Sequence, residues 1–263
     1  MKLITLMTDF GQRDGYTGIM KGVILRIAPD AQFVDLTHEI PPQNVLQGAL
    51  VWSRSCSFFP EGAIHVGVVD PGVGTARRPI AARIGTATYV CPDNGLITLI
   101  LESAEAAGEP VELVELNQPR FWLPEVSNVF HGRDIFAPVA AHLANGVPLR
   151  EVGHPIDNPV RKHPPTPQQL PHGWRGEVVE IDHFGNLGTN LAPEHLQGAQ
   201  TIRFKIAGQE IHGLSRTFGD RTPGELTALI DSSGMLAVAV VNGSAARKMG
   251  VEVGEPVEVH LVD

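Results

Sequence analysis

The chain has little cysteine, little positive charge and no long apolar run. Its two cysteines, Cys56 and Cys91, exclude a disulfide framework and a cysteine-rich zinc site. They favour a reducing compartment, so we expect a cytoplasmic protein. No stretch approaches the roughly 18 to 20 apolar residues of a membrane-spanning helix. The apolar run from Leu3 to Met7 is also too short for a signal peptide, so we expect no membrane partner.

Positively charged residues are outnumbered, because 20 Lys and Arg stand against 29 Asp and Glu, for a formal net charge of −9. This argues against a broad basic surface, so we expect no nucleic-acid partner. Hydrophobic residues make up 43% of the 263 residues and charged residues 19%, as in an ordinary globular protein. The 28 glycines and 21 prolines are not periodic, and they indicate many turns and close backbone approaches.

Several catalytic and cofactor motifs are also missing. The 11 histidines include no H-E-x-x-H motif and no pair at helical spacing beside a carboxylate, so we expect no metal site. The absence of G-x-S-x-G argues against the serine nucleophile of an α/β-hydrolase. Neither a P-loop nor G-x-G-x-x-G is present, since Arg77 stands where the third glycine of the latter would fall.

The N-terminal part of the chain alternates apolar strands with helical patterns. Strands are predicted over 2–7, 31–36 and 63–69, and helices over 16–27 and 44–55. This alternation is typical of an α/β fold, in which helices cover both faces of a mostly parallel sheet. Further strands are predicted over 79–84, 88–91 and 111–116, with helices over 95–103 and 133–145.

A proline-rich segment separates this part from a second one. Pro155 to Pro171 holds six prolines in 17 residues and is predicted to be a linker. Beyond it, the sequence predicts short strands over 176–182, 201–206, 209–213, 236–241 and 256–262, and short helices over 223–229 and 244–249. These indicate a small, mostly antiparallel barrel or sandwich. We therefore predict domains over 1–154 and 172–263, joined by the linker 155–171.

Chemically active side chains follow the predicted strands closely. Asp9, His38 and Asp70 each come soon after a strand, so we expect them near one edge of the sheet, where α/β proteins bind ligands. The two acceptor oxygens of Asp9 suit a ribose diol, and a carboxylate here equally suits a helix N-terminus. Asp70 opens the sequence Asp-Pro-Gly-Val-Gly, which is either a ligand-binding turn or a purely structural one.

Three other segments leave a similar choice open. Arg77 and Arg78 are either a solvated pair or part of a site. His131, at a predicted loop-to-helix junction, either belongs to a site or serves as a capping or packing residue. The turn Asp182-His183-Phe184-Gly185-Asn186 combines an acid, an aromatic ring and an amide, which suits either a barrel turn or a site for a cationic or stacking ligand.

Seven short motifs occur in an order that resembles one enzyme family. They are Thr8-Asp9-Phe10-Gly11, Lys21-Gly22-Val23-Ile24, Asp35-Leu36-Thr37-His38-Glu39-Ile40, Val69-Asp70-Pro71-Gly72-Val73-Gly74, Pro92-Asp93-Asn94-Gly95-Leu96, Phe130-His131-Gly132-Arg133-Asp134-Ile135-Phe136-Ala137-Pro138 and Ile181-Asp182-His183-Phe184-Gly185-Asn186. Together, across nearly the whole chain, they resemble the S-adenosylmethionine hydroxide adenosyltransferases, also called adenosine-forming S-adenosylmethionine hydrolases. That family is similar to the fluorinase and chlorinase enzymes, which attack S-adenosylmethionine with halide.

The resemblance implies a Rossmann-like N-terminal domain and a small antiparallel C-terminal β-barrel. It implies hydrolysis of S-adenosylmethionine to adenosine and L-methionine, with water as the other substrate and no cofactor. It also implies a homotrimer that binds the substrate between one subunit's N-terminal domain and a neighbour's C-terminal domain.

The resemblance further implies roles for individual residues. Those that would activate water are Asp70, Arg77 and His131. Those that would bind the substrate are Asp9 at the ribose, Asp182 at the methionine ammonium, Phe184 and Asn186 at the nucleoside, Ser232 and Ser233 at the methionine carboxylate, the backbone around Val240 at the adenine edge, and also Asp14 and Phe218.

The chemistry of this reaction fits these residue types. A thioether leaves the sulfonium as a neutral group and needs no acid, whereas water is a poor nucleophile at neutral pH. Arg77 would favour hydroxide by its charge, and either Asp70 or His131 would accept the proton. Alignment of the nucleophile with C5′ would supply much of the remaining acceleration.

Two other functions remain as alternatives, a halide-using S-adenosylmethionine transferase and a binding module without turnover. The fluorinating relatives have a tyrosine in place of Asp70, an aromatic residue in place of Gln43 and a hydroxyl in place of Gly132. A carboxylate at position 70 would repel a halide and suits water. Many hydrolase relatives carry an acid where this chain has Ala237, so one nucleoside contact differs. The presence of all three water-activating residues argues against a module that only binds.

Overall fold

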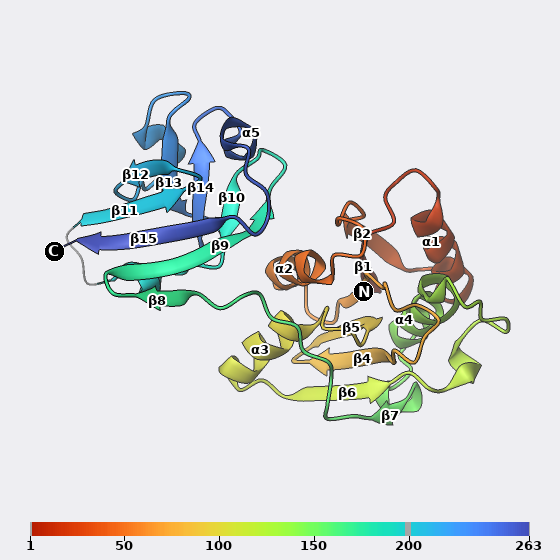
Figure 1. Cartoon of the computed structure of the whole chain (residues 1–263). Helices are drawn as coiled ribbons and strands as arrows, with labels where there is room; N and C mark the ends of the chain where they lie inside the picture. Colours follow the sequence, from red (N-terminus) through yellow and green to blue (C-terminus); the bar gives the residue numbers. More distant parts are fainter. Residues whose placement is uncertain (1, 198–200, 263) are drawn as a thin grey trace. The chain divides into compact units, whose positions relative to one another are not determined.

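The structure is a computed structural model that describes residues 2–197 and 201–262. The chain divides into two compact units, Met1–His163 and Pro164–Asp263, each with its own sheet (Figure 1). The division falls inside the proline-rich segment. Strand β7 (His154–Pro155) pairs in the first unit and strand β8 (Gln168–Leu170) in the second, so both ends of this segment are tied to a sheet.

The N-terminal unit is built on a seven-stranded mixed sheet in the order β2-β1-β3-β5-β4-β6-β7. Its other strands are β1 (Leu3–Thr8), β2 (Gln32–Thr37), β3 (Ile64–Val68), β4 (Pro79–Ile84), β5 (Ala87–Pro92) and β6 (Val111–Glu115). The first four strands in this order pair in parallel, and β4 and β7 run against their neighbours. The predicted α/β fold with a mostly parallel sheet is confirmed.

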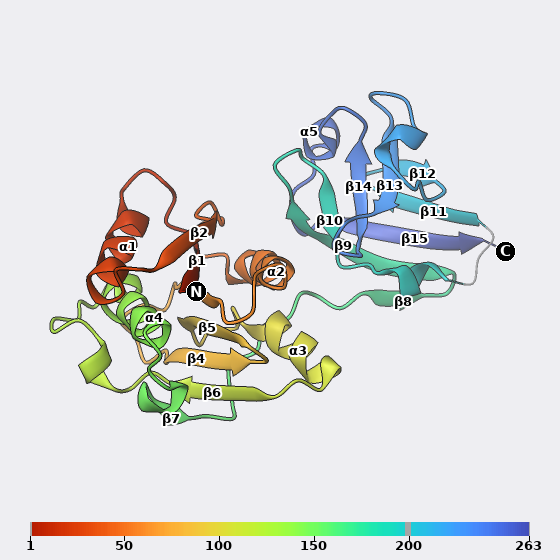
Figure 2. The same cartoon turned by 180° about the vertical axis from the view of Figure 1, so that it is seen from behind.

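Helices cover both faces of this sheet (Figures 1 and 2). Helices α1 (Tyr16–Ile27) and α4 (Ala137–Ala144) lie on one face, and α2 (Val45–Cys56) and α3 (Thr98–Ala107) on the other. Strand β1 contributes to both cores, since Ile4 and Leu6 pack with the first pair of helices and Met7 with the second. Burial on both faces explains why this strand is a continuous apolar run.

Parallel pairing brings the ends of the first three strands to one edge of the sheet. Thr8 lies opposite Val68, and Met7 lies opposite Thr37. The chain therefore leaves the sheet at Asp9, His38 and Asp70 on the same side, as the sequence predicts. Hydrogen bonds join two of these exits, since the Gly11 N–H donates to the His38 carbonyl at 2.7 Å.

The C-terminal unit is an antiparallel, barrel-like sheet in the order β12-β11-β15-β9-β10-β14-β13, with β8 beside β9. Its strands are β9 (Gly173–Ile181), β10 (Leu187–Thr189), β11 (Thr201–Ile206), β12 (Gln209–His212), β13 (Leu226–Ile230), β14 (Leu236–Val240) and β15 (Pro256–Val262), and its helix is α5 (Ala245–Met249). A bridge between Ser215, just beyond β12, and Leu229 of β13 connects the two ends of this order. The sheet thus nearly closes around a core that includes Phe204 and Leu187, and the predicted β-barrel is confirmed.

One predicted helix is wrong. The sequence pattern favours a helix over 223–229, but Leu226–Ile230 forms strand β13, which pairs with β14. A short apolar run does not distinguish a strand from a buried helix by periodicity. Gly224, whose φ is 88°, ends the preceding turn, and the pairing with β14 then satisfies the backbone of the run. None of the helices in the described ranges is long and apolar enough to cross a bilayer.

Candidate active site

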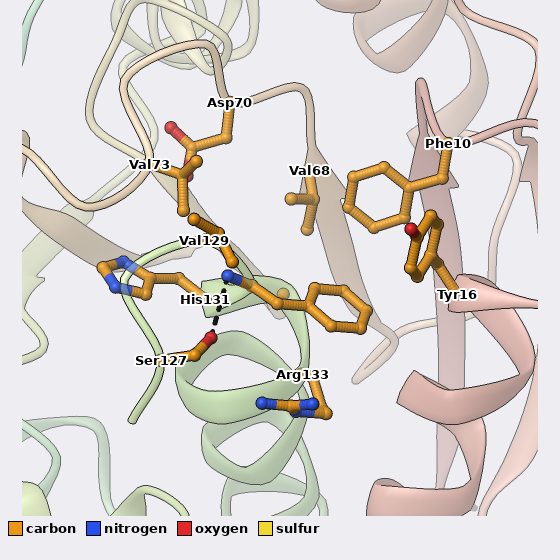
Figure 3. A pocket seen from close by; sticks show the side chains of 11 residues that line it. Phe10, Tyr16, Val68, Asp70, Val73, Ser127, Val129, His131 and Arg133 are labelled. Carbon is orange, nitrogen blue, oxygen red and sulfur yellow. Dashed lines mark hydrogen bonds between the residues drawn. The ribbon is translucent and has the colours of Figure 1, made fainter. Parts of the chain in front are cut away.

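A cavity of about 460 Å³ opens at the carboxyl edge of the N-terminal unit's sheet. Figure 3 shows two sides of different chemistry, with Asp70 and His131 on one and the rings of Phe10 and Tyr16 on the other. The chain beyond β1, the loop after β3 and the segment before α4 supply these residues. The cavity therefore lies where an α/β sheet is expected to bind a ligand.

Asp70, Arg77 and His131 form one hydrogen-bonded cluster. The Arg77 guanidinium donates from Nε to Asp70 Oδ1 at 3.0 Å and from Nη2 to Asp70 Oδ2 at 2.5 Å. The same Nη2 lies 3.1 Å from Nδ1 of His131. The side chains of Asp70 and Arg77 are 4% and 6% exposed, so they form a buried bidentate ion pair. The structure thus brings together the three residues predicted to activate water.

A tight turn after β3 shapes this cluster. The Val73 N–H donates to the Asp70 carbonyl at 3.2 Å. Gly74 has a φ of 76°, and a Cβ at this position would lie 2.1 Å from the carbonyl oxygen of Asn128. Only glycine lets the turn approach the segment before His131 this closely.

A buried carboxylate holds the segment that carries His131. This segment leads into a π-helix, Gly132–Phe136, which α4 follows directly. The predicted helix over 133–145 corresponds to these two elements together. Asp134 is fully buried and accepts hydrogen bonds from the N–H and the Oγ–H of Ser127, both at 2.8 Å. It also accepts from Arg133 Nε at 2.6 Å. Burial opposes the ionisation of Asp134, but the hydrogen bonds from Arg133 and Ser127 outweigh it and lower its pKa.

Burial shifts the pKa values of Asp70 and His131 in opposite directions. It raises the pKa of the Asp70 carboxyl, although the charge and hydrogen bonds of Arg77 act against this rise. It lowers the pKa of His131, and the charge of Arg77 lowers it further. Asp70 is therefore a stronger proton acceptor than an exposed aspartate, and His131 is a weaker one than an exposed histidine.

The hydrogen bond with Arg77 assigns the two ring nitrogens of His131. A guanidinium only donates, so Nδ1 accepts and the neutral ring carries its proton on Nε2. Both nitrogens are then engaged, and neither has a free lone pair. The carboxylate of Asp70 keeps acceptor capacity beyond its two bonds from Arg77, because each oxygen has two lone pairs.

The neighbouring arginine has a different partner. Arg78 pairs with Asp93, with Nη2 2.5 Å from Oδ2, and donates from Nη2 to the carbonyl of Asn158 at 2.8 Å. Oδ1 of Asp93 accepts from the N–H of Val160 at 2.8 Å. Arg78 thus ties the proline-rich segment to the sheet edge, and the interpretation of Arg77 and Arg78 as a solvated pair is wrong.

Asp9 and Asp14, predicted to bind the substrate, lie in the loop between β1 and α1 but are not lining residues of this cavity. Asp9 Oδ2 accepts from the backbone N–H of Gln43 at 2.7 Å, and the charge of Asp9 contributes to the raised pKa of Asp70. Asp14 is exposed. His38 is 1% exposed, with Nδ1 2.9 Å from Thr8 Oγ1, so it packs inside the unit.

Most residues predicted to bind the substrate in the C-terminal unit line one pocket of about 420 Å³. They are Asp182, Phe184, Asn186, Phe218 and Ser232. The rings of Phe184 and Phe218 are 72% and 48% exposed, so both are available to a ligand. The structure therefore brings these five side chains together.

Asp182 also organises the turn in which it lies. Its Oδ1 accepts from the N–H groups of Phe184 and Asn186 at 2.9 and 2.8 Å, and its Oδ2 from Nδ2 of Asn186 at 2.7 Å. The structural and the ligand-binding interpretations of this turn thus apply to the same residues. Ser233, whose Oγ–H donates to an aspartate within its own turn, and Val240, which is buried in the core, are not lining residues of the pocket.

Three aromatic residues of the cavity in the N-terminal unit are missing from the predicted site. They are Phe10, Tyr16 and Phe130, whose ring centroids lie 5.3 to 6.0 Å apart. Phe10 and Phe130 stand in two of the motifs quoted above. Tyr16 is a large aromatic residue at the first position of α1, and it is 45% exposed. The sequence alone does not indicate that Phe130, far along the chain, contacts Phe10 and Tyr16.

The arrangement in the N-terminal unit suits activation of a small nucleophile. The Asp70 carboxylate, with its raised pKa, lines a cavity large enough for part of a nucleoside, and a fixed guanidinium is hydrogen-bonded to it. Within residues 2–197 and 201–262, no group of three or more His, Cys, Asp or Glu side chains is placed to hold a metal ion.

Comparisons with known proteins agree along the whole chain. Residues 4–153 match the SAM hydroxide adenosyltransferase N-terminal domain, and residues 176–258 match the C-terminal domain of the same family. Over 261 residues, 97% of each chain, the protein is 41% identical to the (R)-S-adenosyl-L-methionine hydrolase of Salinispora arenicola. It is 32% identical to the fluorinase of an Actinoplanes species, with 90% of each chain covered.

A solved structure shows the same likeness. The crystal structure of an uncharacterized conserved protein from Thermotoga maritima superposes with a TM-score of 0.88 at 35% identity, covering 98% of this chain and 99% of that one. The matches of both domain models and the identity to relatives of equal length point to the same group of proteins. The chain therefore belongs to the SAM hydroxide adenosyltransferase family.

Proposed function

We propose that the protein hydrolyses S-adenosylmethionine to adenosine and L-methionine. The observation that carries this proposal is the hydrogen-bonded Asp70–Arg77–His131 cluster, of which Asp70 and His131 line a cavity at the sheet edge. The relatives that share 39 to 41% identity with the chain and carry the name (R)-S-adenosyl-L-methionine hydrolase support it.

The reaction is an in-line displacement at C5′ of the ribose. A water oxygen forms the new bond to C5′ as the bond from C5′ to sulfur breaks, and the bonding pair remains on sulfur, which leaves as a neutral thioether. The water proton is transferred to a general base. Because no electrons are exchanged with a cofactor and the leaving group needs no Lewis acid, we propose that the enzyme needs neither a cofactor nor a metal.

Asp70 is the general base that the geometry favours. Its pKa is raised by burial, whereas Nδ1 of His131 is occupied by Arg77 and the pKa of the ring is lowered. The Arg77 charge stabilises the hydroxide character that develops on the attacking water. His131 accepts a hydrogen bond from the same Nη2 of Arg77 that binds Asp70, and so helps to hold the guanidinium in place.

The same cluster disfavours a halide as nucleophile. The Asp70 carboxylate repels an anion, and its partner Arg77 is already engaged in two hydrogen bonds to it. Water is neutral, so the carboxylate does not repel it, and it can transfer a proton to Asp70. The fluorinases among the relatives are also less similar to this chain than the hydrolases, at 32% against 41% identity.

The first experiment follows adenosine and methionine by chromatography after incubation with S-adenosylmethionine. Both sulfonium epimers are supplied separately, because the names of the relatives specify the R form. We expect product with the wild type, a large loss with Asp70→Asn, and no change with Asp30→Asn, a control whose carboxylate is 84% exposed. In ¹⁸O-water the label should enter the 5′-hydroxyl of adenosine. Absence of adenosine with both epimers, or an unlabelled hydroxyl, contradicts the proposal.

We further propose that the protein is a cytoplasmic homotrimer in which the substrate contacts two subunits. Two observations support an assembled site: Asp70 and His131 line a cavity in the N-terminal unit, and five of the predicted substrate-binding residues line a pocket in the C-terminal unit. The two cysteines are free and buried, in keeping with a reducing compartment.

Mixed oligomers test this assembly. Asp70→Asn and Asp182→Asn each impair one of the two cavities, so each variant alone should be strongly impaired. If a site takes its two parts from different subunits, random co-assembly restores about a quarter of the wild-type sites. Light scattering after size exclusion gives the subunit number. No recovery in the mixture, or a monomeric mass, contradicts the shared site.

A further inference from the structure

Phe10, Tyr16 and Phe130 form a corner of three aromatic rings in the cavity that also holds Asp70. The planes of the rings stand at 75°, 76° and 75° to one another, and their centroids lie 6.0, 5.8 and 5.3 Å apart. Three rings that are nearly mutually perpendicular can present three faces toward one point. In the ideal arrangement of three perpendicular rings whose faces converge, centroid separations of this size place the common point about 4 Å from each centroid, within the range of a cation–π interaction.

From this geometry we propose that the aromatic corner binds the sulfonium cation of the substrate and discriminates it from the neutral thioether. The inference rests on the proposed hydrolysis of S-adenosylmethionine. Ring faces carry negative electrostatic potential and attract a soft, weakly hydrated cation such as a sulfonium. The aromatic corner can thus favour the cationic sulfonium over a neutral thioether without a carboxylate in contact with the sulfur.

The direction of attack is consistent with this placement. The attacking oxygen, C5′ and sulfur must lie in a line, so sulfur is roughly 5 Å from the oxygen, on the far side of C5′. With water activated at Asp70, sulfur then points away from the side of Asp70 and His131. The rings of Phe10 and Tyr16 lie on the opposite side of the cavity (Figure 3).

A neighbouring cation already contacts one ring. The Arg133 guanidinium lies 5.2 Å from the centroid of the Phe130 ring, and Asp134 binds this guanidinium through Nε and Nη2 at 2.6 and 3.1 Å. Pairing with Asp134 reduces the repulsion that Arg133 would exert on a second cation. Because Arg133 already contacts the Phe130 ring, sulfonium binding depends chiefly on the rings of Phe10 and Tyr16.

The corner has a kinetic consequence. Sulfur loses its positive charge as the bond to C5′ breaks, so the cation–π interaction is strongest in the bound substrate and weakens toward the transition state. Removing a ring should therefore raise KM without lowering kcat, as for an interaction made mainly in the ground state. The neutral thioether of the product gains little from the rings, so the corner does not retain it.

The test compares the cationic substrate with S-adenosylhomocysteine, its neutral thioether analogue. KM for S-adenosylmethionine and Ki for S-adenosylhomocysteine are measured for the wild type, Tyr16→Leu and Tyr16→Phe. We expect Tyr16→Leu to reduce the preference for the cation about tenfold, which corresponds to about 1.4 kcal/mol, with kcat unchanged or higher. Tyr16→Phe keeps the ring face and should keep the preference.

Phe10→Leu provides a second variant on another element, so failure of one variant to fold leaves the test intact. A preference unchanged in both leucine variants overturns the aromatic corner, and so does a lower kcat at unchanged KM. Neither outcome affects the proposed hydrolysis, which the wild type demonstrates by itself. Conversely, a wild type that binds S-adenosylmethionine without turnover overturns the proposed function, and the ratio of the two dissociation constants still tests the corner.

Discussion

Replacement of Arg77 by methionine should destabilise the N-terminal unit strongly. The side chains of Asp70 and Arg77 are 4% and 6% exposed, and two hydrogen bonds of 3.0 and 2.5 Å join them. Arg77→Met removes these bonds and leaves a buried carboxylate without its countercharge. Breaking a buried ion pair in this way costs about 3–5 kcal/mol. Removing both charges, in Arg77→Met with Asp70→Leu, should restore most of the free energy of unfolding, because well-packed apolar residues replace a buried pair at little or no cost.

The destabilisation should depend on pH in a defined direction. In Arg77→Met, burial still raises the pKa of Asp70, and the opposing charge of Arg77 is gone. The ionised carboxylate is then less favourable in the folded state than in the unfolded state. The full loss appears above the folded-state pKa, shrinks as the pH falls through it and is gone below the unfolded-state pKa, because the protonated carboxyl needs no countercharge. The stability deficit of the variant should therefore be large at pH 8 and smaller in mildly acidic buffer.

Urea denaturation followed by tryptophan fluorescence measures these changes. A Trp174→Phe background confines the signal to Trp52 and Trp122, both in the N-terminal unit. Arg78→Met is the matched control, since Asp93 keeps its hydrogen bond from the Val160 N–H at 2.8 Å and Arg78 is 27% exposed. The control should lose less than Arg77→Met. A loss below about 1 kcal/mol in Arg77→Met, or a loss equal at both pH values, would refute the reasoning.

Three further outcomes are expected. In the wild type, kcat/KM should fall with decreasing pH as Asp70 becomes protonated, at a higher pH than for an ordinary aspartate because burial raises its pKa; a rate that stays constant to about pH 4 contradicts this. Asp134→Asn should lower kcat about tenfold to a hundredfold in steady-state assays, because it loosens the segment that carries His131, the hydrogen-bond partner of Arg77, and unchanged kcat argues against that positioning role. Gly74→Ala should lose more than about 2 kcal/mol of unfolding free energy, because its Cβ would meet the Asn128 carbonyl at 2.1 Å. Gly62→Ala, with a φ of 78° and nothing within 4 Å, should lose only about 1 kcal/mol, and equal losses contradict the steric argument.

Much of the fold class can be predicted from patterns of neighbouring residues in the sequence. Strands β1 and β3 are mostly apolar and buried at every position, and such a composition is typical of strands covered on both faces. The predicted helix over 16–27 matches α1 residue for residue, because its pattern is long enough to be unambiguous. The run at 226–230 is too short for that, and its strand conformation depends on pairing with β14, a contact that local pattern does not encode.

The cluster of Asp70, Arg77 and His131 follows from local sequence pattern only in part. The position of Asp70 after β3 follows from the strand pattern, since parallel strands deliver their carboxyl ends to one edge. Which of two adjacent arginines pairs with it does not follow, because Arg77 and Arg78 differ only in their distant partners, Asp70 and Asp93. The choice of Arg77 rested on the family resemblance.

The layout of the protein, an α/β unit followed by a barrel, and the sheet edge at which Asp9 and Asp70 lie can be predicted from local sequence patterns. Hydrophobic periodicity and turn residues act over a few neighbouring positions, so helices, strands and turns can be predicted from the sequence. What depends on the tertiary structure is the environment of Asp70 and His131, because burial raises the pKa of Asp70 and lowers that of His131, and Arg77 hydrogen-bonds to both. Folding of the unit also brings Phe130 against Phe10 and Tyr16, because Phe130 lies more than a hundred residues further along the chain.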